Sequence, residues 1–287
     1  MPPEILRYAA FTSTPEGGNP AGVVLDAAAL DDADMQRIAA EVGYAETAFV
    51  TEPAVGEDPR RSRLRYFSPI SEVPFCGHAT IATAVALAAR DGEGAFDFET
   101  PVGAITIETS RIGGQLTAAF TSVEPEVVDI DGDVLDSLLA LLGATRSDLH
   151  PELPPRISFA GNRHPVLVFS SRRFFDSFAF DPAAMRSLMD AQGWAGTVTT
   201  LRIVGDAEFE ARNLFPVGVI TEDPATGSAA ASVGGYLRAL GRPPGRVVIH
   251  QGAHVGRPSL LTIDIPAAGG IVVSGSAVQI TGRVEIA

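Results

Sequence analysis

EVPFCGHA, at residues 72–79, recurs in altered form as EDPATGSA, at residues 222–229. The two stretches share Glu, Pro, Gly and Ala at an offset of 150 residues, which is four of eight positions. Each places a glycine directly before a segment of small apolar residues, 79–90 and 229–240, and helices that are apolar on most faces are usually buried. Two unrelated turns could share Pro and Gly by chance. Four matches before the same kind of helix favour an internal duplication. An Arg-plus-Phe-Pro element also precedes each copy of the repeat, at 65–69 and 212–216.

Short strands are expected around both helices. Alternating runs between Pro and Gly turns predict strands at 96–100, 104–108, 115–120, 166–169, 197–204, 247–250, 260–265, 271–273 and 277–286. Helical periodicity predicts three further helices, at 31–42, 133–142 and 182–191. Two buried helices among many short strands predict an α+β fold, with two sheets that each wrap around their own helix.

The composition excludes several classes of protein. The 287 residues suit two domains of ordinary size. The net charge is 21 − 35 = −14, and such a surface repels phosphate backbones, so no nucleic-acid partner is expected. No apolar run reaches the roughly 20 residues that a membrane span needs. The N-terminus lacks a cationic-then-apolar signal pattern, and we expect a cytoplasmic protein without a membrane partner.

The cysteine and histidine pattern argues against a metal or a disulfide. Cys76 is the only cysteine, so the chain can form no intramolecular disulfide and no cysteine-rich metal cluster. His250 and His254 are four residues apart but flank a strand-loop region rather than a helix, and no metal site is predicted there. The sequence also lacks a Gly-x-Ser-x-Gly elbow and a phosphate-binding loop.

Five segments resemble the phenazine-biosynthesis F-type (PhzF-like) isomerase family. They are 18–24 (GNPAGVV), 46–49 (ETAF), 75–80 (FCGHAT), 222–229 (EDPATGSA), and 251–259, which begins with Gln-Gly and ends with Gly-Arg-Pro-Ser. Their order and spacing match the family from residue 5 to the C-terminus. The resemblance is specific because the Gly-His-Ala-Thr and Glu-Asp-Pro-Ala-Thr-Gly-Ser strings occur together.

The resemblance implies the diaminopimelate-epimerase-like fold. In this fold two pseudo-symmetric domains each wrap a barrel-like, mostly antiparallel sheet around a central helix. The implied domains are 1–118 with a returning C-terminal strand at 275–287, and 119–274. The family places its active site in the cleft between the domains, commonly in a homodimer. Its type reaction is isomerisation of trans-2,3-dihydro-3-hydroxyanthranilate by proton transfer, without metal or organic cofactor.

The two helix starts are the expected binding site for a small carboxylate substrate. A helix N-terminus presents N–H groups and partial positive charge, so it attracts anions. Gly77 and Gly227 let a ligand approach the backbone closely. Together with Ser228, they are the candidate contacts of the carboxylate.

Glu46 is the candidate catalytic residue. It follows the expected helix stop at Gly43 and opens an apolar strand at 47–50. Burial favours the neutral form of a carboxyl group, which suits Glu46 to take and return a proton near neutral pH. A solvated, inert glutamate at a strand edge is the alternative from the pattern alone. The match to the catalytic glutamate of the family favours the catalytic role.

The resemblance also places His78 and Asp223 in the active site. His78 could hold the substrate or pass a proton, or it could simply cap its helix. Asp223 could bind the substrate amine or assist the final tautomerisation, or it could be a turn residue before Pro224. Asn19 is a candidate ligand contact, and a turn role before Pro20 is equally consistent with the sequence.

The cysteine count restricts the reaction type. The Cys-Gly-His string also resembles proline-racemase-like enzymes, which need two thiols on opposite faces of the α-carbon. The second repeat holds Ala225 and Thr226 at the matching positions, so a two-thiol racemase is excluded. Cys76 is expected to be a small buried residue without chemistry.

A single glutamate suits an allylic or 1,3-type isomerisation, because one base can remove a proton and return it to another carbon on the same face. Two alternatives stay open. The first is an epimerase on an amino-acid-like substrate, with Glu46 opposed by Asp223 or His78. The second is a non-catalytic metabolite-binding protein that has kept the fold.

Overall fold

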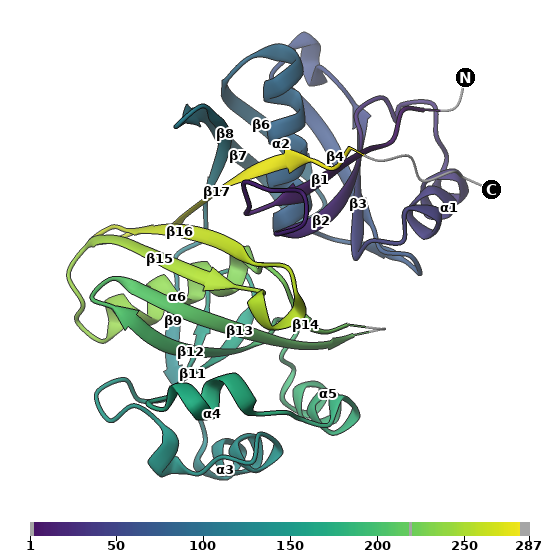
Figure 1. Ribbon diagram of the computed structural model, residues 1–287. Coiled ribbons are helices and arrows are strands. Elements are labelled where there is room, and N and C mark those ends of the chain that lie inside the picture. Colours follow the sequence, from purple (N-terminus) through teal and green to yellow (C-terminus); the bar gives the residue numbers. More distant parts are fainter. Residues whose placement is uncertain (1–2, 218–219, 282–287) are drawn as a thin grey trace. The chain divides into compact units, whose positions relative to one another are not determined.

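The computed structural model describes residues 3–217 and 220–281, and the chain divides into two compact units (Figure 1). Unit 1 comprises Met1–Thr121 and Ser274–Ala287, and unit 2 comprises Ser122–Val273. Each unit combines helices with a mostly antiparallel sheet, which confirms the expected α+β class. Within the described residues, no helix is both long and apolar enough to cross a membrane.

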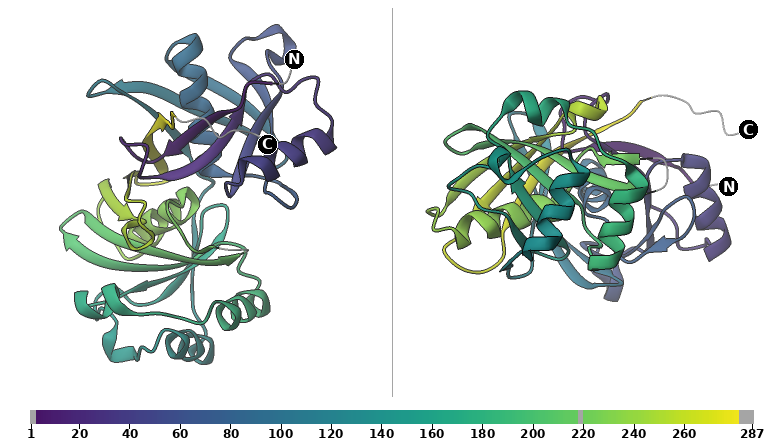
Figure 2. Two further views of the ribbon diagram at one scale, coloured as in Figure 1. Left: turned by 45° about the vertical axis from the view of Figure 1, so that its right-hand side comes forward. Right: turned by 90° about the horizontal axis from the view of Figure 1, so that it is seen from below.

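Unit 1 is a sheet wrapped around one helix. Its strands are β1 (Leu6–Ala10), β2 (Asn19–Val24), β3 (Glu46–Glu52), β4 (Arg61–Phe67), β5 (Glu72–Val73), β6 (Gly94–Thr100), β7 (Gly103–Ile112), β8 (Gln115–Thr121) and the later part of β17 (Val272–Gln279). Helix α2 (Gly77–Asp91) lies inside and contacts β1, β2, β3, β7 and β8 (Figures 1 and 2). Helix α1 (Asp32–Val42) packs outside, against β3 and β4.

The composition of α2 explains its central position. All residues from His78 to Ala88 are buried, and most are alanine or another small residue. Small side chains let the surrounding strands approach the helix closely. The hydroxyls of Thr80 and Thr83 donate to the carbonyls of Cys76 and Ala79, at 2.7 and 2.8 Å, so these buried polar groups have partners within the helix.

Unit 2 repeats the same plan. Its strands are β9 (Glu126–Asp129), β10 (Arg156–Phe159), β11 (Arg163–Val168), β12 (Val198–Gly205), β13 (Glu208–Val217), β14 (Ile220–Asp223), β15 (Gly245–Gln251) and β16 (Ser259–Ile265). Helix α6 (Gly227–Ala239) contacts β9, β10, β11 and β16. Its residues from Ala229 to Leu237 are all buried.

The strand pairing confirms the duplication. In unit 1, β2 pairs parallel with β3 and β4 pairs parallel with β6. In unit 2, β11 pairs parallel with β12 and β13 with β15. The antiparallel pairs β1–β2, β3–β4, β4–β5 and β6–β7 likewise correspond to β10–β11, β12–β13, β13–β14 and β15–β16. The repeated sequence motif therefore runs from β5 into the start of α2 in unit 1, and from β14 into the start of α6 in unit 2.

Three helices form a second core on the outer face of unit 2 (Figures 1 and 2). They are α3 (Gly132–Leu141), α4 (Arg172–Ser177) and α5 (Pro182–Gln192). Their side chains, such as Leu138, Phe175 and Met185, are fully buried with those of the sheet. The helices expected at 133–142 and 182–191 are confirmed. The sequence did not predict α4, because its six residues are too few to show helical periodicity.

The two strands expected at 271–273 and 277–286 were wrongly separated, because the described part of this region forms the single strand β17. Gly275 lies inside this strand and is needed there for close packing. A Cβ at Gly275 would lie 2.3 Å from Cδ1 of Phe11, so the glycine lets the strand pass over that ring. Residues 282–286 of the expected strand lie outside the described chain.

Candidate active site

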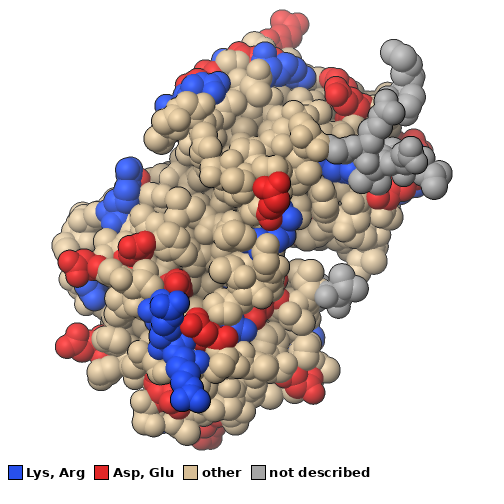
Figure 3. Space-filling model, in the orientation of Figure 1, with Lys and Arg blue, Asp and Glu red and all other residues tan. Residues whose placement is uncertain are grey.

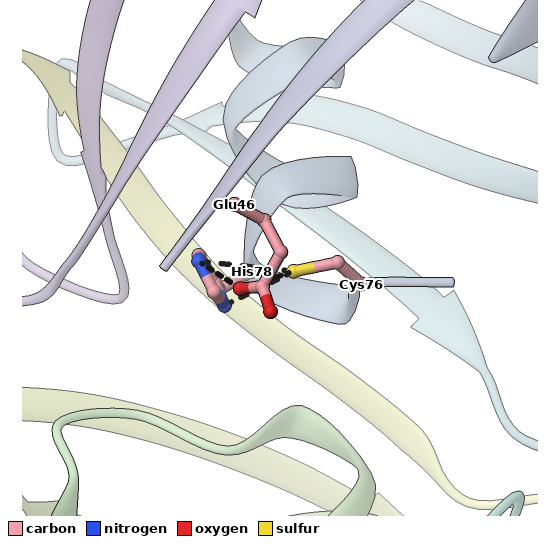
Figure 4. A group of neighbouring side chains, drawn as sticks. All are labelled: Glu46, Cys76 and His78. Atoms are coloured by element: carbon pink, nitrogen blue, oxygen red, sulfur yellow. Dashed lines mark hydrogen bonds and ion pairs between the residues drawn. The ribbon is translucent and has the colours of Figure 1, made fainter. Parts of the chain in front are cut away.

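Glu46, Cys76 and His78 form a compact cluster at the start of α2 (Figure 4). Helix α1 ends at Gly43, whose φ of 70° is left-handed, and the chain then enters β3 at Glu46. Glu46 pairs with Ala21 of β2 in parallel register. A strand start therefore supplies the carboxylate, and the first turn of the central helix supplies the thiol and the imidazole.

Each of the three side chains lies within 3.5 Å of the other two. Oε2 of Glu46 lies 3.4 Å from the Cys76 Sγ and 3.5 Å from Nε2 of His78. The Sγ lies 3.3 Å from Nδ1 of His78. The Glu46 side chain is 21% exposed and that of His78 only 7%, so solvent reaches the carboxylate while the imidazole is held inside. This arrangement can transfer a proton between a ligand and Glu46.

Buried hydroxyls support the cluster from behind. The hydroxyls of Tyr66 and Thr80 are 2.7 Å apart, and Thr80 also donates to the carbonyl of Cys76. Tyr66 is fully buried, and burial raises the pKa of its phenol, so it stays a neutral donor. These bonds fix the backbone from which Cys76 and His78 project.

Asn19 begins β2 and is buried, opposite Ala10 of β1. It lies two residues before Ala21, the partner of Glu46. The preceding Gly18 has a φ of 66°, and a Cβ there would lie 2.4 Å from the carbonyl oxygen of Ala10. The Gly-Asn pair therefore makes the tight entry to the strand that adjoins Glu46.

In unit 2, Asp223 ends β14 and bonds within its own loop. The Thr226 hydroxyl donates to Oδ2 of Asp223 at 2.5 Å. The Gln251 amide nitrogen donates to the Asp223 carbonyl at 2.7 Å and lies 3.0 Å from the Thr226 hydroxyl. These contacts agree with the turn role that the sequence left open, and Asp223 remains partly exposed.

The late Gln-Gly segment packs against this loop. Gly252 has a φ of 79°, and a Cβ there would lie 2.5 Å from the carbonyl oxygen of Pro224 and 2.3 Å from that of Arg257. Because both neighbours are backbone atoms, no side chain fits. The segments 222–229 and 251–259 therefore pack directly against each other at the start of α6.

Ser228, in the first turn of α6, is held by a buried histidine. Its Oγ lies 3.1 Å from Nε2 of His164, which is fully inaccessible on β11. Nδ1 of His164 lies 3.0 Å from both the backbone nitrogen and the carbonyl oxygen of Thr197. Burial lowers the pKa of His164 to about 4, so the ring is neutral near pH 7. In the tautomer that accepts from the Thr197 N–H, His164 donates to Ser228, and Ser228 retains its own hydrogen for a ligand.

On the face shown in Figure 3, arginine side chains lie among aspartate and glutamate side chains rather than in one patch. Ion pairs of this kind include Arg246–Asp264 and Arg202–Glu210.

A family model described as phenazine biosynthesis-like protein (PhzC-PhzF) matches residues 8–285. The chain belongs to the PhzF family. It is 30% identical over 293 residues to the uncharacterized isomerase YfhB of Bacillus subtilis, with 98% of both chains covered. It is 33% identical over 258 residues to the trans-2,3-dihydro-3-hydroxyanthranilate isomerase of Pseudomonas fluorescens, covering 88% of this chain and 86% of that one. Because relatives that match most of the chain are isomerases, this PhzF-family protein is an isomerase.

Solved structures agree with this assignment. A PhzF-family phenazine biosynthesis protein from Bacillus anthracis has a TM-score of 0.83 at 25% identity, covering 97% of this chain and 98% of that chain. A probable proline racemase from Agrobacterium radiobacter has a TM-score of 0.62 at 12% identity, covering 98% and 93%, and shares the fold alone. The diaminopimelate-epimerase-like fold is therefore confirmed for this PhzF-family member.

Two residues of the site were not selected from the sequence. Cys76 is buried as expected, yet its thiol contacts both Glu46 and His78. His164 gave no signal because it lies in an apolar strand, β11, where a histidine is usually only a core residue. The structure brings Glu46 and His78 together in unit 1, and it places Asp223, Gly227 and Ser228 at the start of α6 in unit 2.

Proposed function

We propose that this PhzF-family isomerase moves a proton between two carbons of a small carboxylate substrate, with Glu46 as the single acid/base and without a cofactor. The supporting observation is the position of the Glu46 carboxylate, which is reached by solvent on one side and contacted by Cys76 and His78 on the other. Such a group can accept a proton from a ligand and return it.

In the proposed mechanism, Glu46 removes a proton from one carbon, and the electrons of the broken C–H bond shift along the adjacent double bond. Glu46 then delivers the proton to the far carbon on the same face. Atoms and charge balance without an outside reactant. His78, within 3.5 Å of the same carboxylate oxygen, holds Glu46 in position and can bond to a polar substituent of the substrate.

The proposed contacts of the substrate carboxylate are the backbone at Gly77 and Gly227 and the hydroxyl of Ser228. The first N–H groups of a helix lack partners within the helix and carry partial positive charge. Asp223 is proposed to contact the amine of an amino-acid-like substrate, and Asn19 another polar group. These roles, like the predicted cleft that would unite them, stay predictions.

The substrate class follows from kinship with the Pseudomonas fluorescens enzyme, whose name gives trans-2,3-dihydro-3-hydroxyanthranilate as the compound it isomerises. We propose a cyclic or unsaturated amino or hydroxy acid of similar size. A homodimer is also proposed, on the family resemblance, and light scattering on the purified protein measures it directly.

The test is proton NMR of the protein in D₂O with trans-2,3-dihydro-3-hydroxyanthranilate and a panel of small amino and hydroxy acids. Double-bond migration with deuterium uptake supports the proposal, and the responding compound names the substrate class. Inversion at an α-carbon without migration would replace it with epimerisation. Tight binding without exchange in any compound would replace it with a binding role.

A further inference from the structure

The cluster of Glu46, Cys76 and His78 contains three different metal-binding groups. The donor atoms are Oε2 of Glu46, Sγ of Cys76 and Nε2 of His78. The oxygen lies 3.4 Å from the sulfur and 3.5 Å from the nitrogen, and the sulfur lies 3.7 Å from the nitrogen. All three atoms therefore occupy the corners of a nearly equilateral triangle.

This triangle has the size of one face of a zinc tetrahedron. Zn–S bonds are about 2.3 Å, and Zn–N and Zn–O bonds are about 2.0 to 2.2 Å. In a tetrahedron these bond lengths separate neighbouring ligand atoms by about 3.3 to 3.7 Å. The observed separations need adjustment of only about 0.1 to 0.3 Å. A fourth position then points away from the triangle and suits a water molecule or another small ligand.

The backbone holds the ligands ready for a metal. Cys76 and His78 flank Gly77 at the first turn of α2, and both side chains are buried. The Thr80 hydroxyl fixes the Cys76 carbonyl. Glu46 comes from the separate strand β3 and is the most exposed of the three, so its carboxylate is the ligand most accessible to an ion in solution.

The ligand chemistry selects the metal. A thiolate is a soft ligand that favours zinc over magnesium or calcium, which prefer all-oxygen sites. One thiolate and one carboxylate neutralise the two charges of the ion, and a neutral imidazole completes the set.

We propose that Glu46, Cys76 and His78 bind a zinc ion, and that the bound ion blocks the isomerase. The ion would not be a cofactor: it would bond to the carboxylate that must carry the proton, so occupied protein could not react. The binding itself depends only on the geometry of the cluster, whereas the block rests on the proposed function of Glu46.

The binding test uses cobalt(II) as a spectroscopic probe of the zinc site in the full-length protein. We expect one equivalent to give the near-ultraviolet absorption of a thiolate-bound cobalt, which zinc then removes by competition. Loss of a residue that hydrogen-bonds to a metal ligand costs about 10- to 100-fold in metal affinity. Cys76→Ala loses a ligand itself, so it should weaken zinc binding at least about 100-fold. Circular dichroism and thermal unfolding check that the variant is folded.

The matched control is His250→Ala. His250 pairs with Glu208 at 2.6 Å on the surface, so it offers an exposed imidazole and carboxylate that could bind zinc adventitiously. Affinity unchanged by His250→Ala and lost in Cys76→Ala supports the site. A cobalt spectrum without the thiolate band, or equal zinc affinity in folded Cys76→Ala, would overturn it.

The block is measured separately as solvent-proton exchange by the zinc-loaded protein. We expect loss of exchange when zinc is bound and full recovery with a chelator. Exchange that persists in fully loaded wild-type protein would overturn the block. If zinc binds with the thiolate absorption but the protein never catalyses solvent-proton exchange, the metal site is supported and the proposed function is contradicted.

Discussion

Arg212 and Glu222 form a buried ion pair in unit 2, with Nη2 of the arginine 2.5 Å from Oε1 of the glutamate. Arg65 and Glu72 form the corresponding pair in unit 1, with two contacts of 2.7 Å. Each pair joins two neighbouring strands, β4 to β5 in unit 1 and β13 to β14 in unit 2, directly before the loop that leads to the central helix. The Arg and Glu of the sequence repeat therefore have the same structural role twice.

The two pairs should differ greatly in their contribution to stability. The Arg212 and Glu222 side chains are only 7% and 9% exposed, against 26% and 38% for Arg65 and Glu72. Removing one partner of a buried pair leaves an uncompensated charge and costs about 3 to 5 kcal/mol. An exposed pair contributes about 0 to 1 kcal/mol.

We therefore predict that Glu222→Gln lowers the free energy of unfolding by about 3 kcal/mol and Glu72→Gln by less than about 1 kcal/mol. Urea denaturation of the two variants beside the wild type measures both. Equal losses would contradict the argument from burial.

His164 makes a second prediction, on the pH dependence of stability. Its pKa is about 4 in the folded protein and 6.5 ordinarily. Between these values the unfolded chain binds more protons than the folded one, so stability falls as pH is lowered, by about 1.4 kcal/mol per pH unit. The full contribution is present above pH 6.5.

The free energy of unfolding should therefore decrease by about 2 kcal/mol less in His164→Gln than in the wild type when the pH is lowered from 7 to 5. His250→Gln, at an exposed position, controls for the removal of a histidine as such. If wild type and His164→Gln lose stability in parallel over this range, the buried neutral histidine is not responsible.

Gly252 provides a third prediction, because two backbone oxygens block a side chain there. Gly252→Ala should cost more than the roughly 1 to 3 kcal/mol of a strained backbone position, and it should also displace the Asp223–Thr226 loop. Gly256→Ala is the matched control, since Gly256 has a similar φ of 72° with no atom within 4 Å of the added carbon. Thermal unfolding of both variants measures the difference, and equal melting temperatures would contradict the packing argument.

The duplicated plan was visible in the sequence because its markers are local. A Pro-Gly loop before a helix of small residues can be recognised without knowing the fold. The parallel strand pairs β2–β3 and β4–β6 were not visible in the sequence, because which strands pair depends on tertiary packing. For the same reason the sequence did not show that β17 continues through Gly275, the residue that the packing of Phe11 requires.

The candidate site was predictable only in part. Glu46 and His78 are predicted site residues from separate segments of the sequence, and the structure places them 3.5 Å apart; their roles stay predictions. The sequence predicts no role for Cys76, because a single buried cysteine gives no sign of what faces its sulfur. His164 is bound to Ser228 across 64 positions of sequence, and nothing in either local pattern indicates that contact.

The most direct test of the account compares Glu46→Gln with Glu52→Gln, at the opposite, exposed end of β3. The measurement is the rate of proton transfer into the product of the responding substrate in D₂O. We predict that Glu46→Gln lowers this rate by about 10²- to 10⁴-fold, the usual contribution of a general acid/base, while Glu52→Gln retains it. We also predict that some product keeps the hydrogen of the substrate, because one glutamate carries it. A folded Glu46→Gln variant that transfers protons at the wild-type rate would contradict the central claim.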